Sequence, residues 1–198
     1  TEGGGLNLYK PITNSFEAFL ENPNNRKTTP WSNNIYSIFT DRNNFLWLGY
    51  ENSFSAFNPR TGIYQHYHTN TSNRLPIGKV NGFAQTEDGA VWAATEASGL
   101  IRIDPMTRVL EFYTHDAGDP ASIGSNKLDS ILADRHGKIW LGSNGFGVSR
   151  YDPNLNIATR YFNSGADVRS LISNAVVGVY EDLNGNVWVA TVEGLSLY

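Results

Sequence analysis

Residues 134–143 of the chain read Asp-Arg-His-Gly-Lys-Ile-Trp-Leu-Gly-Ser, and this stretch decides the fold. Asp134 can accept hydrogen bonds from the backbone of its own turn, and Gly137 can adopt a positive φ without steric cost. The Ile-Trp-Leu run at 139–141 supplies the β-branched and aromatic residues that suit a pleated, half-buried strand. The stretch therefore predicts a tight turn that leads into a β-strand, with Gly142 leaving room for a neighbouring backbone.

The same pattern occurs three more times, at residues 41–50, 86–95 and 182–191. The tryptophans of the four copies are separated by 92 − 47 = 45, 140 − 92 = 48 and 188 − 140 = 48 residues. A tryptophan at a period of about 40 to 50 residues indicates a repeat architecture, and repeats of this length with several short strands are typical of β-propellers.

Each repeat divides into four strand-like runs. The first precedes the turn and holds small residues, the second carries the tryptophan, the third follows a short glycine-bearing turn, and the fourth ends in an aromatic residue. An Asn-Pro or Asp-Pro pair follows the third run, where proline is tolerated because it interrupts no central strand. The sequence therefore predicts an all-β fold, a β-propeller built of four-stranded antiparallel blades.

When the repeats are aligned, the chain comprises a partial blade at 1–26, complete blades at 27–71, 72–117 and 118–166, and a second partial blade at 167–198. In this register residues 15–19 form a fourth strand, although they could also form a short helix. Three complete and two partial blades close neither a four-bladed nor a five-bladed ring, so we expect an arc of a larger ring of about seven blades. Open sheet edges would pair with the remainder of the propeller or with another copy of the chain.

Composition narrows the function classes. The net charge of −4 and the lack of a Lys/Arg cluster argue against a nucleic-acid partner. Because the chain has no cysteine, disulfides and thiolate metal sites are excluded. No apolar run approaches the roughly 20 residues that span a bilayer, and no signal peptide heads the chain. We therefore expect a soluble piece of a larger protein, without membrane contact by this segment and without a cofactor.

The recurring polar residues have a structural interpretation. We expect Asp41, Asp134 and Asp182 to cap their turns, because each turn offers fewer oxygens than the roughly six that calcium prefers. The four repeated tryptophans should form the core between blades. His66 and His68 lie two residues apart on an outer fourth strand; this spacing can bind metal, but an exposed pair of this kind is more often inert, and no metal site is predicted.

No signature of catalysis stands out. The sequence contains no G-x-S-x-G nucleophile elbow. The paired carboxylates at 87–88 and 181–182 fall at repeated turn positions, which favours structure over acid–base chemistry. The glycines at 3–5 lie between two expected strands and not before a helix, so they do not form a phosphate-binding loop.

The residues that vary between repeats are the candidates for ligand binding. In a propeller, the loops from strand four to the next strand one share a face with the loops between strands two and three. Aromatic rings beside amides and charges on that face could stack on a sugar and bind its hydroxyls, although ordinary loop residues would look the same. The candidates are Trp31, Asn33, Tyr50, Asn52, Lys79, Glu96, Asn144, Phe146 and Arg169.

Together, residues 134–143 and the later run Gly147-Val148-x-Arg150-Tyr151-Asp152-Pro153 resemble the two-component regulator propeller repeat. The other copies depart from its pattern at Asn44, Tyr50, Ser53 and Thr86. The resemblance implies the extracytoplasmic, periplasmic sensor of a bacterial membrane receptor whose output domain is a histidine kinase or a diguanylate cyclase. Some members of this family bind oligosaccharides, so an oligosaccharide or another small ligand is the expected partner.

Two other functions stay open at this stage. One is a propeller enzyme, such as a polysaccharide or streptogramin-type lyase, which would need His, Glu and Lys or Arg gathered around the axis. The other is a protein-interaction scaffold whose open sheet edges associate.

Overall fold

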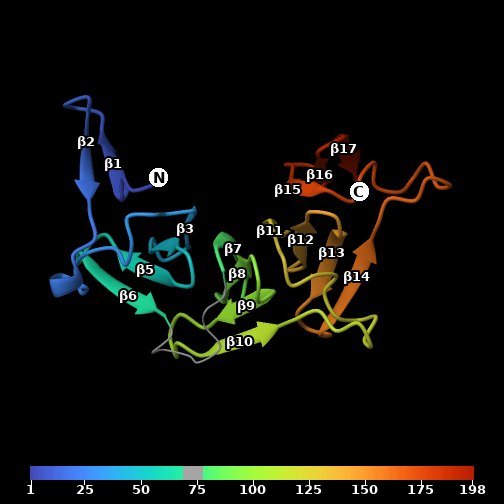
Figure 1. Cartoon of the computed structure of the whole chain (residues 1–198), viewed down its shortest axis with the longest axis horizontal. Coiled ribbons are helices and arrows are strands. Elements are labelled where there is room, and N and C mark those ends of the chain that lie inside the picture. Colours follow the sequence, from blue (N-terminus) through green and yellow to red (C-terminus); the bar gives the residue numbers. More distant parts are fainter. Residues whose placement is uncertain (69–77) are drawn as a thin grey trace. The chain divides into compact units, whose positions relative to one another are not determined.

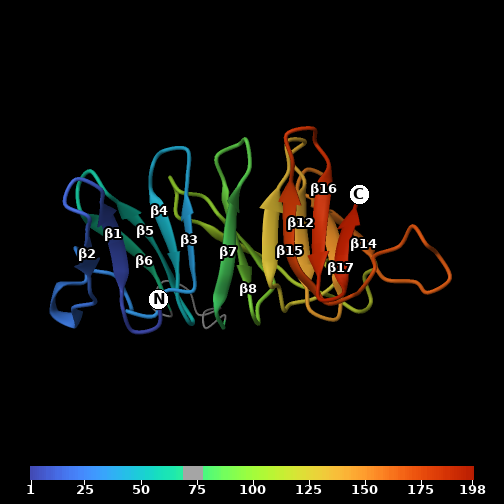
Figure 2. The ribbon, with the colours of Figure 1, turned by 90° about the horizontal axis from the view of Figure 1, so that it is seen from above.

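The computed structural model describes residues 1–68 and 78–198, which form two compact units, Thr1–Val80 and Asn81–Tyr198. Regular structure in the described residues is β-strand, apart from one 3₁₀ turn at Pro23–Asn25. The strands form five separate sheets that follow one another in chain order (Figure 1). Figure 2 shows the strands of each sheet running side by side.

The first unit contains two sheets. Sheet I pairs β1 (Leu6–Lys10) with β2 (Ser15–Phe19), so residues 15–19 form the predicted strand and not a helix. Sheet II is the antiparallel meander of β3 (Ser37–Thr40), β4 (Leu46–Gly49), β5 (Phe54–Asn58) and β6 (Ile63–Tyr67).

The second unit contains three sheets. The first strand of the first of these sheets starts at Val80, which is the last residue of the first unit. Sheet III runs β7 (Val80–Gln85), β8 (Val91–Thr95), β9 (Leu100–Ile103) and β10 (Leu110–Tyr113). Sheet IV runs β11 (Ser130–Ala133), β12 (Ile139–Ser143), β13 (Gly147–Asp152) and β14 (Ile157–Tyr161). Sheet V has three strands, β15 (Val176–Glu181), β16 (Val187–Thr191) and β17 (Gly194–Leu197).

The predicted fold class is confirmed: these are the antiparallel blades of a partial β-propeller. Each predicted blade range contains one of the five sheets. The blade boundaries themselves, and the number of blades in the ring, stay predictions.

The turn before each tryptophan strand is held by one side chain. Asp134 Oδ1 accepts hydrogen bonds from the backbone N–H groups of His136 (2.9 Å) and Lys138 (2.8 Å). Its Oδ2 accepts a third from Trp140 Nε1 at 2.8 Å. Asp41 and Asp182 make the same three bonds in their own sheets. The turn-capping role is therefore confirmed, and each carboxylate also fixes the indole of its blade.

In sheet III, where Thr86 replaces the aspartate, two residues share that task. Thr86 Oγ1 accepts from Trp92 Nε1 at 2.9 Å and donates to Asp88 Oδ1 at 2.5 Å. Asp88 Oδ1 in turn accepts the N–H of Ala90 at 3.2 Å. The weaker repeat therefore keeps the same turn and the same indole contact through a relay of two side chains.

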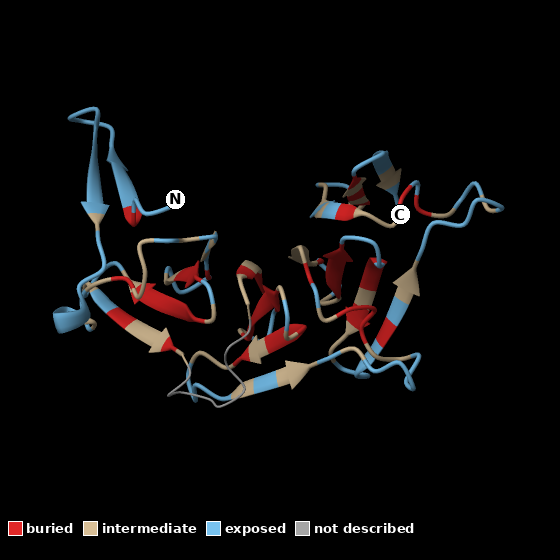
Figure 3. Ribbon diagram, viewed as in Figure 1, coloured by how far each residue is buried: buried red, intermediate tan, exposed pale blue. Residues whose placement is uncertain are grey.

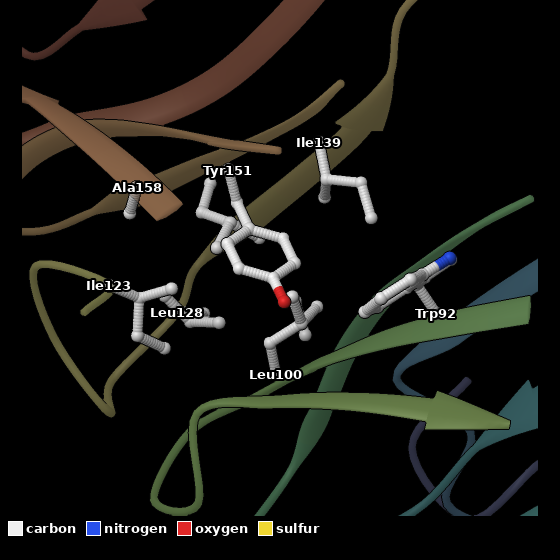
Figure 4. Close-up of a cluster of buried hydrophobic side chains, with 9 residues drawn as sticks. Trp92, Leu100, Ile123, Leu128, Ile139, Tyr151 and Ala158 are labelled. Carbon is white, nitrogen blue, oxygen red and sulfur yellow. The ribbon is translucent and has the colours of Figure 1, made fainter. Parts of the chain in front are cut away.

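The tryptophans form the core between sheets of the second unit, as predicted. Trp92 packs with Leu100 of sheet III against Ile139 and Tyr151 of sheet IV (Figure 4). Trp140 packs in the same way against Val176 and other residues of sheet V. Figure 3 shows buried residues concentrated in the tryptophan strands and their neighbours. Trp188 is only half-buried, unlike Trp92 and Trp140 at 1% exposure.

The glycine after the tryptophan strand permits close approach of the next sheet. A Cβ atom on Gly142 would collide with Ser130 Oγ of its own sheet and with the Val176 side chain of sheet V. The predicted room for a neighbouring strand is thus present, and it lets the first strands of sheets IV and V pack closely.

Candidate functional site

Within each unit, the loops between the second and third strands meet the linkers that lead into the next sheet at one end of the sheets. Glu51, in the loop after β4, forms a β-bridge with Lys79, and Asn144, in the loop after β12, forms one with Ala175. In both cases the second residue belongs to the linker that leads into the next sheet. The expectation that these loops share a face is confirmed inside each unit.

Trp31 is held by neighbouring side chains of its own unit. Its ring stacks on the His68 ring, with centroids 4.2 Å apart and planes 13° from parallel. The Arg26 guanidinium carbon lies 4.6 Å from the centre of the same ring. The structure thus gives this tryptophan a role that the sequence did not suggest: it fastens the linker between sheets I and II to His68, the residue that follows β6.

His66 secures the same linker. Its Nε2 lies 2.6 Å from the carbonyl oxygen of Arg26 and its Nδ1 lies 2.7 Å from Ser55 Oγ. Because a carbonyl only accepts, Nε2 carries the proton, and the Ser55 hydroxyl donates to Nδ1. Burial lowers the pKa of His66, which favours this neutral form. The histidine is not the exposed surface residue we expected, since both ring nitrogens are engaged.

Tyr50 lies in the interior, with 0% exposure, because it packs in the core between sheets I and II. Burial raises its pKa to about 12. Its hydroxyl accepts the N–H of Trp31 at 3.4 Å. Tyr50 was predicted as a ligand contact, but its ring offers no surface to a ligand. Burial also raises the pKa of nearby Tyr64, whose hydroxyl has no hydrogen-bond partner among the described residues.

Asn33 belongs to a repeated structural feature. Its carbonyl accepts the N–H of Gly5, and its Oδ1 accepts the N–H of Glu21. Asn126 and Asn174 make the equivalent pair of bonds at the start of their own blades. The signal was present in the sequence as the pairs Ser32-Asn33, Ser125-Asn126 and Ser173-Asn174. These asparagines tie each linker to the third strand of the preceding blade.

An exposed polar and aromatic surface remains in the first unit. Lys79 Nζ lies 4.8 Å from the centre of the Tyr36 ring, which is 42% exposed. Glu51 is exposed beside them, and Asn52 exchanges two hydrogen bonds with Gly78. We call Tyr36, Glu51, Asn52 and Lys79 the Tyr36 patch. Sequence reasoning missed Tyr36 because the residue falls in the first strand-like run of its repeat, whereas β3 begins one residue later.

In the second unit, the predicted ligand-binding residues lie in three different loops. Phe146 is 51% exposed in the loop after β12, beside Asn144, whose N–H donates to Asp129 Oδ2 at 2.7 Å. We call Asn144 and Phe146 the Phe146 patch. Glu96 lies in the loop after β8 and is half-buried. Arg169 lies in the linker before sheet V, where its Nε pairs with Asp167 at 3.1 Å.

A cavity of about 920 Å³ opens beside sheet V. Its walls include the Trp140, Tyr161 and Tyr198 rings, together with Arg160 and Arg169. Of the predicted residues only Arg169 lines it. Sequence reasoning did not foresee the cavity, because it depends on what lies next to β17 in space.

Within residues 1–68 and 78–198, no three His, Cys, Asp or Glu residues are grouped so that they could hold a metal ion. Over the same residues, no helix has the length and apolar character that crossing a membrane requires.

Residues 30–52 match the family model of the two-component regulator propeller. This part of the chain is therefore similar to a two-component regulator propeller repeat. No functionally curated sequence is significantly similar to the chain. The matched residues include the last part of the linker after sheet I and the first turn and tryptophan strand of sheet II.

Solved structures support the propeller fold. The extracellular domain of the proposed hybrid two-component system BT4673 from B. thetaiotaomicron is 21% identical, with a TM-score of 0.77 over 98% of this chain and 25% of that chain. The corresponding domain of BT3049 from the same organism is 20% identical, with a TM-score of 0.70 over 100% of this chain and 31% of that chain. The chain therefore spans about a quarter to a third of the length of these two structures.

A virginiamycin B lyase from Staphylococcus aureus is also similar, at 12% identity and a TM-score of 0.66, over 99% of this chain and 63% of that chain. At this level of identity the similarity shows only a shared propeller fold.

Proposed function

We propose that the chain is a non-catalytic, ligand-sensing segment of an extracytoplasmic propeller in a bacterial two-component or diguanylate-cyclase receptor. The observation that carries the proposal is the regulator propeller repeat at residues 30–52, set in a fold similar to the extracellular domains of two hybrid two-component systems. The periplasm is the compartment that fits such a receptor segment.

The geometry agrees with a binding role. The polar residues that recur from blade to blade are engaged in the blade framework, as Asp134 is with its turn and Trp140. Two exposed aromatic residues that do not recur, Tyr36 and Phe146, lie at the loop end, in the Tyr36 patch and the Phe146 patch. Aromatic rings flanked by amides and charges suit sugars, because a ring can cover the apolar face of a pyranose while polar groups bind its hydroxyls. We therefore propose an oligosaccharide as the ligand.

A glycan array followed by thermal-shift titration tests this proposal. A glycan that binds should raise the melting temperature of the chain, and either Tyr36→Ala or Phe146→Ala should remove most of that shift. Leu183→Ala is the matched control, because Leu183 is 96% exposed in the turn between β15 and β16, at the other end of the sheet. If no glycan raises the melting temperature while a protein partner does, the ligand is a protein and the carbohydrate proposal is wrong.

The fold is shared with virginiamycin B lyase, so a streptogramin-type lyase is the enzymatic alternative to be tested. Incubation of the chain with a streptogramin B antibiotic, followed by mass spectrometry, measures any conversion of the antibiotic. We expect an intact antibiotic at all times. Conversion that depends on enzyme concentration would contradict the non-catalytic role.

A further inference from the structure

Two arginines occupy the same place in sheets III and IV. Arg102 on β9 lies opposite Trp92 in the sheet, and Arg150 on β13 lies opposite Trp140 in the same way. The guanidinium carbon is 5.9 Å from the centre of the tryptophan ring in sheet III and 5.8 Å in sheet IV. The two side chains therefore start from equivalent backbone positions and extend over the same kind of ring.

In sheet III two carboxylates hold the guanidinium. One terminal nitrogen of Arg102 lies 3.0 Å from Asp88 Oδ2, and the other lies 3.0 Å from Glu111 Oε2. Asp88 belongs to the turn before the tryptophan strand, and Glu111 lies opposite Arg102 on β10. The charge of Arg102 is thus neutralised by its own sheet.

Sheet IV keeps the arginine but has neither carboxylate. His136 stands where Asp88 stands in sheet III, since each comes four residues before the tryptophan of its repeat. Thr159 lies opposite Arg150 on β14, in the place that Glu111 takes on β10. None of the ion pairs formed by the described residues includes Arg150.

The acidic residue of β13 itself is already engaged, because Asp152 pairs with Lys138 at 2.5 Å. Arg150 Nε is buried and has no hydrogen-bond partner among the described residues. A guanidinium in this position carries a charge that is only partly hydrated and that no carboxylate neutralises. An anion at its terminal nitrogens is therefore stabilised more than at a fully hydrated surface arginine.

The accessibility of this place is not specific to sheet IV. Arg102 keeps 28% of its side chain exposed although the next sheet along the chain, sheet IV, has four strands. Arg150 is likewise half-buried, and His136 and Thr159 beside it are exposed. A ligand can therefore approach Arg150 from solvent.

We propose that Arg150 is a binding site for the carboxylate group of a small acidic ligand, which takes the place that Asp88 and Glu111 take beside Arg102. The planar guanidinium suits the two oxygens of a carboxylate, and sheet III shows that an arginine at this place binds such groups. The ligand class comprises small organic acids and acidic sugars, and it excludes neutral sugars. The site lies outside the Tyr36 and Phe146 patches and does not depend on the sensing role.

Titration of carboxylates, followed through the Nε–H signal of Arg150 in ¹H–¹⁵N NMR spectra, tests the proposal. Sodium acetate and sodium glucuronate are the probes, and glucose is the neutral probe. Sodium chloride keeps the ionic strength constant, because salt screens exposed charges. We expect both carboxylates to shift the signal until it saturates, and glucose to leave it unchanged. Tighter binding of glucuronate than of acetate would identify an acidic sugar, and equal binding would identify small acids in general.

The matched variant carries His136→Asp and Thr159→Glu, which give Arg150 the two carboxylates that Arg102 has. Both substituted residues are exposed, so the variant retains the fold. We expect its affinity for both carboxylates to be at least about tenfold lower than that of the parent chain. The Nε–H signal of Arg102 is the internal control and should not move in either protein, because its guanidinium is already paired.

Three results would overturn the proposal. They are the lack of a saturable shift at Arg150 in the parent chain, equal shifts at Arg102 and Arg150, and equal affinity in the parent chain and the variant.

Discussion

Two interfaces between neighbouring sheets, III with IV and IV with V, each contain one tryptophan ring and two tyrosine rings. Trp92, Tyr113 and Tyr151 form the first group, with centroids 5.3 to 6.0 Å apart. Trp140, Tyr161 and Tyr198 form the second, with centroids 4.7 to 6.0 Å apart. The tryptophan is 1% exposed in both interfaces.

The two interfaces differ in what covers the third ring. Ala158 on β14 packs in the first interface, and the Tyr151 hydroxyl donates to Asn156 Oδ1 in the turn before that strand, at 2.8 Å. The Tyr198 side chain is 59% accessible, and a cavity of about 920 Å³ adjoins its ring. The three rings are therefore arranged alike in the two interfaces, which differ in how far the third ring is covered.

Removal of a tryptophan gives the largest expected effect. Trp92→Ala should lower the free energy of unfolding by about 3 to 5 kcal/mol, because it leaves a cavity in a closed core. Trp140→Ala should cost less, at the lower end of that range, because its ring already borders the open cavity. Urea unfolding of the two variants measures the difference. Equal losses would mean that the second interface is as closed as the first.

The tyrosines provide a matched pair for the same comparison. Tyr151→Ala should cost about 3 kcal/mol, as expected for a fully buried aromatic residue, whereas Tyr198→Ala should cost less than about 1 kcal/mol. Chemical unfolding followed by circular dichroism measures both. A large loss for Tyr198→Ala would show that its ring is as buried in solution as that of Tyr151.

Two glycines test the fourth strand directly. Gly147 has φ 68°, and a Cβ there would collide with the carbonyl oxygen of Tyr161 on β14. Gly147→Ala should therefore cost about 2 to 3 kcal/mol. Gly194 stands at the equivalent place, but an added Cβ would meet only Ile172 at 3.3 Å. Gly194→Ala should cost about 1 kcal/mol, from its backbone conformation alone. Melting temperatures of the two variants rank them, and the reverse order would contradict the model of an uncovered β17.

The smallest effect concerns the turn of sheet V. Hydrogen bonds from Trp188 and Asn186 lower the pKa of Asp182 to about 2. A carboxyl group whose pKa is lower in the folded state stabilises the protein above its unfolded pKa of about 3.9, and that stabilisation is lost as the pH falls towards 2. Asp182→Asn should therefore lower the urea midpoint at pH 5, and the difference from the parent chain should shrink between pH 4 and pH 2. A difference that does not depend on pH would rule out this linkage.

Local patterns carried the fold prediction. The Asp-x-x-Gly turn and the tryptophan strand act over a few residues, and the repeat adds four copies of the same evidence. For that reason the turn caps, the strand at residues 15–19 and the tryptophan core between sheets were all predictable. The hydrogen bond from the indole to the carboxylate was not predictable, because it depends on the direction of a tryptophan side chain six residues after the aspartate.

The candidate site was less predictable, because exposure depends on packing between distant segments. Tyr50 and Asn33 look like variable loop residues in sequence, but one is buried between sheets and the other ties a linker to its neighbouring strand. Phe146 and Lys79 do lie in exposed or half-exposed loops, and Tyr36 joins Lys79 only in the folded chain.

The sequence by itself determined the repeating unit of this protein, because hydrogen bonds within one turn and the alternation along one strand are encoded by neighbouring residues. Only the tertiary structure decided which surfaces those units leave uncovered. The cavity beside β17, the hydrogen bonds from Arg160 to the linker before sheet IV and the engagement of Trp31 by His68 each join residues 37 or more positions apart. Such contacts arise when whole strands pack, and no local pattern in the chain specifies them.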